Sequence, residues 1–350
     1  MLALNLHGLQ QQLAAHLSRT AWAEQMQDLT ILAHGEANVI LRLNPTTLVR
    51  VAVSTPNQRF GGQAQQVTRF EHQILTYLRG SGIGHTLLDA QLQPTPDFPY
   101  TYLITSYLNG SPLDYSPTHL HQAAATLALL HRLPQLGYPV ESLLPTVPLL
   151  EQPLSQFYRE AQAYAQPYLD SPQADPEIVQ MLQAVLARAA EGLKRESQLA
   201  AYPHRCLVHS DHTHENWVIS PERAYLIDWE WAEVGSPAGD LGHFLSPLTV
   251  RRCQDHCLTA AERAAFLQHY YEALDDAALA ERIQQHFAAF GVYPAVRSLC
   301  WTAGYWITAN LWYAQADNPS SQERLARFQR SRQQFPELWQ EIMDWFAELG

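Results

Sequence analysis

The spacing of apolar residues changes about a third of the way along the chain. In residues 29–53 and again in residues 87–108, β-branched and other apolar residues alternate roughly with polar ones. Glycine, proline and asparagine separate these runs, which is typical of strands joined by tight turns. In residues 63–79 apolar side chains instead recur every three or four positions, which indicates a helix. The first third is therefore predicted to be a β-sheet with one helix.

The rest of the chain is predicted to be mostly helical. Apolar positions at helical spacing predict helices over residues 117–132, 151–169, 175–196, 259–274, 278–290, 293–314 and 320–348. The exception is residues 205–228, where short apolar runs indicate strands. We therefore predict the fold class α+β, with a small β-rich N-lobe over residues 1–108 and a larger, mostly helical C-lobe over residues 109–350.

Composition argues against several function classes. The chain has 350 residues and a formal net charge of −12, so it lacks the excess of basic residues that nucleic-acid binding needs. Residues 1–17 have no basic segment or cleavage site of a signal peptide and predict an amphipathic helix. The longest uncharged run, residues 298–316, is too short in apolar length to span a bilayer. Four cysteines form no dense framework, so we expect a cytoplasmic protein that binds neither nucleic acid nor membrane.

Three oxygen-bearing side chains are predicted to lie around one hairpin. The segments NWVIS and AYLID read as short strands, and the three residues between them are typical of a turn. Asn216 begins the first strand and Asp228 ends the second, so antiparallel pairing would bring them to one mouth of the hairpin. Asp211 lies just upstream in the entering loop. Because Mg²⁺ prefers oxygen ligands, this arrangement suits phosphoryl transfer from ATP.

The same segments resemble the motifs of a known family. Residues 209–216, HSDHTHEN, and residues 226–230, LIDWE, resemble the catalytic and metal loops of the aminoglycoside phosphotransferase and choline kinase family. Residues 235–241, GSPAGDL, resemble that family's downstream Gly-Asp-Pro-x-x-Asp-Leu element. The resemblance implies a two-lobed protein-kinase-like fold. It also implies an enzyme that uses ATP and Mg²⁺ to phosphorylate a hydroxyl of a small molecule.

The resemblance implies a chemical role for four matching residues. Asp211 would be the catalytic base, which accepts or orients the proton of the acceptor hydroxyl. Asn216 and Asp228 would hold Mg²⁺, and Glu230 would assist a second metal ion.

Two further residues would brace the site without reacting. The resemblance implies that His209 supports the catalytic loop and that Asp240 binds backbone amides of that loop. The alternative for Asp240 alone is the N-cap of a helix.

The cation that grips the nucleotide phosphates has to be an arginine. The kinase-like fold needs such a cation on its third strand, and the only lysine, Lys194, lies outside the predicted sheet. In residues 47–53, TLVRVAV, Arg50 and Leu48 share the face opposite to the valines. Arg50 is therefore the candidate, since its planar fork suits phosphate, and Leu48 would lie beside adenine.

The helix over residues 63–79 supplies a partner for this arginine. Glu71 falls on its apolar face, where an unpaired carboxylate would be costly. We predict that Glu71 pairs with Arg50. The alternative is a half-exposed Glu71 that contacts Arg69 or solvent.

Two loops complete the predicted nucleotide site. Gly35 lies between two predicted strands, where a phosphate-covering loop belongs, although a plain hairpin explains it equally well. Residues 105–108 end a strand at the lobe boundary and are predicted to be the hinge. There the backbone of Ser106 and Leu108 would bind adenine.

Some features favour other functions. The family often has glycine where this chain has Ser210, although serine is small enough to be tolerated. That change, and the arginine in place of lysine, would suit a catalytically weak nucleotide-binding module, or pseudokinase. His212 and His214 stand beside His209, so a metal hydrolase built on these histidines and Asp211 is a further alternative.

Other properties stay open at this level. Cys253, His256 and Cys257 look like half a zinc site, but no second ligand pair with matching spacing follows, and buried thiols at a helix end are the alternative. The acceptor could be an aminoglycoside, an amino alcohol, a sugar or a ketosamine, all of which the resembling family includes. The sequence does not predict the oligomeric state.

Overall fold

The computed structural model describes residues 4–35, 37–55, 57–254, 257–313 and 319–349. The chain divides into two compact units. The first comprises residues 1–112, 141–147 and 217–231, and the second comprises residues 113–140, 148–216 and 232–350. Two segments from later in the sequence thus belong to the same unit as the β-rich N-terminal part.

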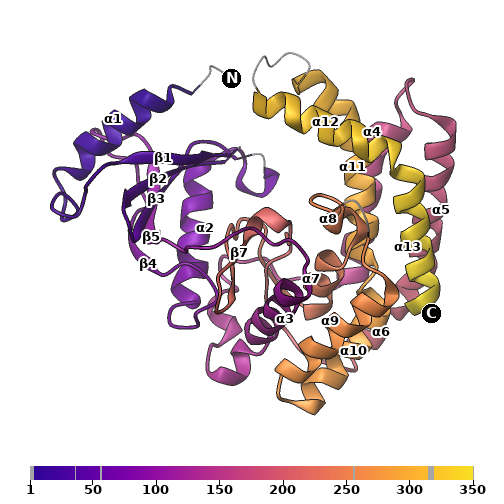
Figure 1. The fold of residues 1–350 in the computed structure, drawn as a ribbon. Coiled ribbons are helices and arrows are strands. Elements are labelled where there is room, and N and C mark those ends of the chain that lie inside the picture. Colours follow the sequence, from indigo (N-terminus) through magenta and orange to yellow (C-terminus); the bar gives the residue numbers. More distant parts are fainter. Residues whose placement is uncertain (1–3, 36, 56, 255–256, 314–318, 350) are drawn as a thin grey trace. The chain divides into compact units, whose positions relative to one another are not determined.

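The first unit is built on a five-stranded antiparallel sheet, which Figure 1 shows in indigo and purple. Its strands are β1 (Thr30–His34), β2 (Asn38–Asn44), β3 (Thr47–Ala52), β4 (Leu87–Gln91) and β5 (Thr101–Ser106). Their order in the sheet is β1-β2-β3-β5-β4, so β3 lies at the centre. The alternating pattern of the sequence predicted these strands, and they are confirmed.

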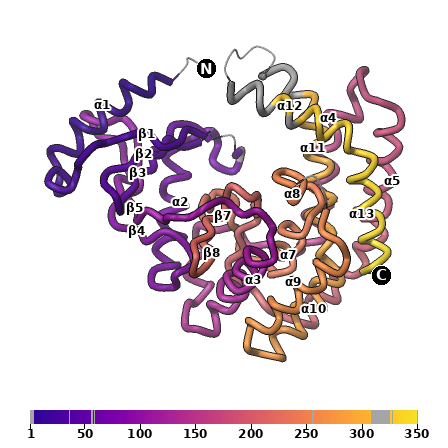
Figure 2. Tube along the Cα trace, in the orientation of Figure 1, coloured from indigo at the N-terminus to yellow at the C-terminus, as the bar shows by residue number. Residues whose placement is uncertain are grey.

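The two faces of this sheet carry different helices (Figure 2). On one face, α1 (Leu6–Leu17) packs Leu9, Leu13 and Leu17 into a core that includes Val49 and Val51 of β3. Because side chains alternate along a strand, Leu48 and Arg50 face the other way. That second face carries α2 (Ala64–Tyr77), the helix predicted over residues 63–79. The position of Arg50 on this face thus follows from the strand periodicity.

A hairpin of β7 (Trp217–Ile219) and β8 (Ala224–Leu226), which the sequence pattern predicted, belongs to the first unit. Hydrogen bonds fasten it on both sides, since Ser111 exchanges backbone bonds with Ile219, and the Leu226 N–H donates to the Ile83 carbonyl. Glycines allow this close approach. A Cβ at Gly110 would lie 2.4 Å from the Ile219 oxygen, and a Cβ at Gly84 would lie 2.6 Å from the Leu226 oxygen.

The second unit is mostly helical. Its longer helices are α3 (Pro117–His131), α4 (Pro153–Leu169), α5 (Pro176–Gly192), α9 (Ala260–Ala273), α10 (Ala277–Phe290), α11 (Tyr293–Tyr313), α12 (Pro319–Gln333) and α13 (Phe335–Leu349). Shorter elements are α6 (Glu196–Leu199), α7 (Pro237–Phe244), α8 (Pro247–Val250) and the antiparallel pair β6 (Cys206–Val208) and β9 (Glu233–Gly235). These elements confirm the α+β fold class. No helix within the described ranges is long and apolar enough to cross a membrane.

Two expectations about these helices need correction. The single helix predicted over residues 320–348 is wrong, because α12 ends at Gln333 and α13 begins at Phe335. Pro336 explains the break, since it lacks an N–H and is tolerated only in the first turn of a helix. The helix predicted over residues 175–196 ends earlier, at Gly192. The helix α7, which begins at Pro237 behind the N-cap Ser236, was not among the predicted helices.

Candidate active site

Arg50, Glu71 and Asp228 form one charged group in the first unit. Arg50 lies on β3 and Glu71 on α2, and both side chains are buried. Nη2 of Arg50 lies 2.8 Å from Oε1 of Glu71 and 3.1 Å from Oδ1 of Asp228. The predicted Arg50–Glu71 pair is thus present, and the half-exposed alternative for Glu71 is wrong. Sequence reasoning missed the second contact of Arg50, which joins positions 178 residues apart.

The two acidic side chains stabilise the positive charge of Arg50, while the charge of Asp228 disfavours that of Glu71. Burial alone would lower the pKa of Arg50, but the carboxylates of Glu71 and Asp228 reverse that effect and raise it. Burial raises the pKa of Glu71, and the charge of Arg50 opposes that rise. The Asp228 side chain is 38 % exposed, so a ligand can still reach it. Its backbone has a φ of +67°, a region that is costly for residues other than glycine and is often found at functional sites.

The predicted hinge contains a buried hydroxyl, that of Thr105, whose burial the sequence did not reveal. Leu48 pairs directly with Thr105 of β5, so both share the face of Arg50. The Thr105 hydroxyl is buried and has no hydrogen-bond partner within the described part of the chain. Ser106 ends β5, and Leu108 follows it, half-buried. Thr105 is therefore an additional candidate for contact with the nucleotide base.

The structure places one further predicted residue of the nucleotide site, Gly35, and adds one that was not predicted, His85. The Gly35 N–H donates to the Asn38 carbonyl at 2.9 Å in the turn between β1 and β2, and Glu36 beside it lies outside the described residues. His85, which sequence reasoning missed, is buried with its Nδ1 2.7 Å from the Ser106 carbonyl oxygen. Because a carbonyl only accepts, Nδ1 carries the proton. Burial lowers the pKa of His85 to about 4, and the charge of Arg50 adds to this effect.

This buried histidine should make the protein sensitive to acid. Between about pH 6.5 and pH 4 the unfolded chain binds a proton at His85 and the folded chain does not, so folding weakens as the pH falls. Acidification from pH 7 to pH 4 should therefore lower the free energy of unfolding of the wild type by about 3 kcal/mol more than that of His85→Asn. Urea unfolding at several pH values measures this. His34→Asn, which changes an exposed histidine, should show the same pH dependence as the wild type. If His85→Asn also lost as much stability on acidification as the wild type, the expectation would be wrong.

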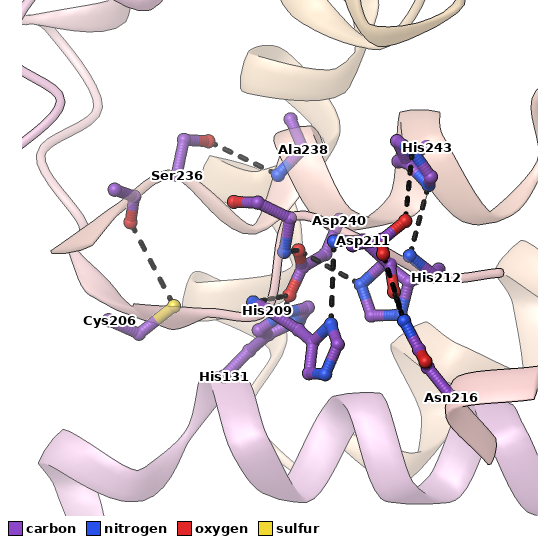
Figure 3. A network of polar contacts seen from close by, with 12 residues as sticks. His131, Cys206, His209, Asp211, His212, Asn216, Ser236, Ala238, Asp240 and His243 are labelled. Carbon is purple, nitrogen blue, oxygen red and sulfur yellow. Dashed lines mark hydrogen bonds and ion pairs between the residues drawn. The ribbon is translucent and has the colours of Figure 1, made fainter. Parts of the chain in front are cut away.

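In the second unit, Asp240 is the centre of the polar network drawn in Figure 3. Its Oδ2 accepts the His209 N–H at 2.9 Å, and its Oδ1 accepts the Ser210 N–H at 2.8 Å. Nε2 of His131 lies 3.1 Å from Oδ2, and Nε2 of His212 lies 2.9 Å from Oδ1. The contacts expected of Asp240 with the loop amides are therefore present. The N-cap alternative is wrong, because Ser236 caps α7.

The same network fixes the protonation of Asp240. Burial alone would raise the pKa of this carboxyl, but the contacts with His212 and His131 hold it well below its usual value. The hydroxyl of Tyr270 lies 2.8 Å from Nδ1 of His131, so a neutral ring can accept there and donate to Asp240 from Nε2. Burial lowers the pKa of His131, which favours that neutral ring. Asp240 is thus a buried carboxylate that holds the loop in one conformation.

One carboxylate oxygen of Asp211 accepts a hydrogen bond from within the same loop. Nδ2 of Asn216 donates to both the backbone oxygen and Oδ2 of Asp211, each at 2.9 Å. The Asp211 N–H donates to Nδ1 of His209 at 3.4 Å. The Asp211 side chain is 31 % exposed and can be reached from solvent. The sequence motif has therefore placed Asp211 and Asn216 in direct contact.

Ser210, next to Asp211, has a φ of +66°. Glycine adopts such a left-handed conformation without a steric penalty, and serine does so at some cost. This explains why glycine suits the position, and the reason is conformation rather than the size of the side chain. Asp240 accepts two hydrogen bonds from backbone N–H groups of the loop, and these offset that cost.

Two of the residues predicted to hold metal, Asn216 and Glu230, have hydrogen bonds that fix their positions. Asn216 directs its nitrogen at Asp211, which leaves its amide oxygen for a cation. Glu230 is fastened through its backbone, since Nδ2 of Asn57 donates to the Glu230 carbonyl at 3.2 Å. Among the described residues, no group of three or more His, Cys, Asp or Glu is arranged to hold a metal ion. His256 of the half zinc site lies outside those residues.

Comparison with known proteins identifies the family. The model of the phosphotransferase enzyme family matches residues 28–282, well over half of the chain. The chain belongs to this family. The matched region includes every residue that we predicted for the site. A search of curated proteins found no match.

Solved structures show the same fold. The choline/ethanolamine kinase family protein from Mesorhizobium loti is 16 % identical, with a TM-score of 0.55 over 95 % of this chain and 99 % of that chain. Choline kinase from Cryptosporidium parvum Iowa II is 14 % identical, with a TM-score of 0.59 over 96 % and 98 %. The GDP and kanamycin complex of APH(2")-IIia is 15 % identical, with a TM-score of 0.59 over 97 % and 99 %. The predicted family and the kinase-like α+β fold are confirmed.

Proposed function

We propose that this phosphotransferase is an active ATP- and Mg²⁺-dependent kinase that moves the γ-phosphate to a hydroxyl of a small molecule, with Asp211 as the catalytic base. The proposal rests on how the side chain of Asp211 is held and how far it is exposed. Its Oδ2 is bonded to Asn216, its side chain is partly exposed, and the loop beneath it is bound by a buried carboxylate. A base in phosphoryl transfer needs this combination of fixed orientation and access to the acceptor hydroxyl.

The nucleotide side of the proposal rests on the first unit. Arg50, fixed by Glu71, would bind the α and β phosphates, and Leu48 with the backbone of Ser106 and Leu108 would bind the base. Gly35 would belong to the loop that covers the phosphates. An arginine can replace lysine here because its guanidinium is always charged and binds phosphate with two parallel hydrogen bonds.

The chemistry of the remaining groups fits Mg²⁺. The amide oxygen of Asn216 and the carboxylates of Asp228 and Glu230 are hard oxygen ligands of the kind this ion prefers. When bound, Mg²⁺ neutralises phosphate charge, and the chain's own residues orient the acceptor and take up its proton. Retention of all these groups argues against the pseudokinase alternative.

The acceptor is proposed only as a class, since kinases of this fold act on chemically different hydroxyls. Neighbours in structure include choline kinases and a complex with kanamycin. A screen should therefore follow ADP release from ATP with Mg²⁺ and single aminoglycosides, amino alcohols, sugars or ketosamines. At least one class should raise the rate above that of ATP alone. If none does, while ATP still binds, the pseudokinase alternative is favoured.

Nucleotide binding can be predicted without an acceptor. We expect ATP with Mg²⁺ to raise the melting temperature of the wild type, by an amount that follows from mass action, and ATP with excess chelator to raise it less. In Asp228→Ala the effect of Mg²⁺ should vanish, because a ligand of the ion is lost. Asp97→Ala, which removes an exposed carboxylate from the same unit, is the matched control. Tightly bound zinc in the purified protein with no nucleotide shift would contradict the kinase proposal.

A further inference from the structure

His243 lies on α7, beside the catalytic loop, and its hydrogen bonding fixes its tautomer. The backbone N–H of His212 donates to Nδ1 of His243 at 3.1 Å (Figure 3). Because that nitrogen accepts, the proton of the neutral ring is on Nε2. Burial lowers the pKa of His243 well below its usual value, and the positive charge of Arg297 acts in the same direction. The ring is therefore neutral, with an N–H at Nε2.

This nitrogen lies near the oxygen of Asp211 that Asn216 does not bind. Nε2 of His243 lies 4.0 Å from Oδ1 of Asp211, and Nδ2 of Asn216 lies 2.9 Å from Oδ2. Each carboxylate oxygen thus has a nitrogen from a different segment beside it. A separation of 4.0 Å is longer than a hydrogen bond, but contacts of catalytic groups often shorten when substrate binds.

We propose that His243 is a positioning residue whose Nε2–H orients Oδ1 of Asp211 toward the acceptor hydroxyl. The inference rests on the proposed role of Asp211 as the base. The histidine makes no bond to substrate and takes up no proton during the reaction. It restricts rotation of the carboxylate, so that Oδ1 keeps one direction while Asn216 holds Oδ2. His243 was not predicted from the sequence, because the motif that identifies Asp240 ends at residue 241.

Two amide variants separate this role from a purely structural one. In His243→Asn the amide can still accept the His212 N–H, but no atom reaches the place of Nε2. In His243→Gln the amide nitrogen reaches that place, and the acceptor for the His212 N–H is lost. A positioning role predicts that the asparagine variant loses activity and the glutamine variant keeps it. A structural role limited to binding the loop amide predicts the reverse order.

The measured quantity is the rate of ATP hydrolysis with Mg²⁺, in which water is the acceptor. We expect kcat to fall about 30-fold in His243→Asn and at most about 3-fold in His243→Gln, with KM for ATP unchanged in both. His286→Asn removes another buried histidine of the same unit and controls for general effects of such a loss. Equal losses in the two His243 variants, or full activity in His243→Asn, would overturn the proposal.

A parallel variant separates this inference from the function beneath it. If Asp211→Asn hydrolyses ATP as fast as the wild type, the proposed role of Asp211 is wrong. If Asp211→Asn is inactive and His243→Asn is fully active, only the positioning role is wrong. ¹⁵N NMR of histidine-labelled protein decides the matter even where turnover is too slow to follow. It should show the Nε2–H tautomer at His243, with a signal that moves in Asp211→Asn, and a ring protonated at Nδ1 would overturn the proposal.

Discussion

Asp211→Asn is expected to lower kcat for phosphoryl transfer by about 10²- to 10⁴-fold, the usual contribution of a positioned general base. Asparagine keeps the size of the side chain, and its amide oxygen can still accept the hydrogen bond from Nδ2 of Asn216. The loop should therefore keep its conformation. It cannot take up the proton of the acceptor hydroxyl. The nucleotide residues Arg50 and Glu71 are untouched, so KM for ATP should stay close to that of the wild type.

Steady-state rates with the best acceptor from the screen measure this effect. Asp170→Asn, an exposed carboxylate at the end of α4, is the matched control and should keep full activity. A melting temperature equal to that of the wild type would show that Asp211→Asn is folded. If Asp211→Asn retained the wild-type kcat, another group would have to be the base, and the proposed mechanism would be wrong.

Asp240→Ala should have the largest effect on stability. The carboxylate is fully buried, and two backbone amides and two histidines surround it. Its removal leaves those donors unsatisfied, so we expect a loss of about 3–5 kcal/mol in the free energy of unfolding. For a chain of this size the melting temperature should fall by about 10 °C. Activity should fall as well, because the loop that presents Asp211 loses its anchor.

The pH dependence of this variant gives a second check. The pKa of Asp240 is held well below its usual 3.8 in the folded protein, so its stabilising effect is present at neutral pH and is lost as the pH falls through the folded value. The stability difference between wild type and Asp240→Ala should therefore shrink in strong acid. Asp170→Ala should change stability by less than about 0.5 kcal/mol. A difference between wild type and Asp240→Ala that does not depend on pH would contradict the ionised state of Asp240.

Local patterns in the sequence predicted much of the fold and part of the site. Alternating residues predicted the central strands, and helical spacing predicted α2, because each pattern depends on neighbours within one element. The Arg50–Glu71 pair was also predictable, since a carboxylate on an apolar helix face needs a cation and the strand offered one. The contact of Asp211 with Asn216 follows from a separation of five residues in one loop.

Contacts between distant segments could not be predicted. His131 and Asp240 are 109 residues apart, and no local pattern relates them. His85 became a candidate only when the structure placed it near Arg50, and the buried hydroxyl of Thr105, a residue of the predicted hinge, was visible only from the pairing of β5 with β3. The strain at Ser210 was also hidden, because the sequence shows the size of a side chain and not its φ angle. By contrast, Pro336 was a visible signal for the start of α13.

In the proposed reaction, the γ-phosphate of ATP passes to a hydroxyl of a small molecule. ³¹P NMR of the products tests it most directly, with wild-type protein, ATP, Mg²⁺ and the acceptor that most accelerates ADP release. The γ-phosphorus signal of ATP should be replaced by that of a phosphomonoester, in amounts equal to the ADP formed. The same reaction with Asp211→Asn should give almost none. Recovery of the γ-phosphorus only as inorganic phosphate, or unchanged ATP with every acceptor class, would rule out this transfer.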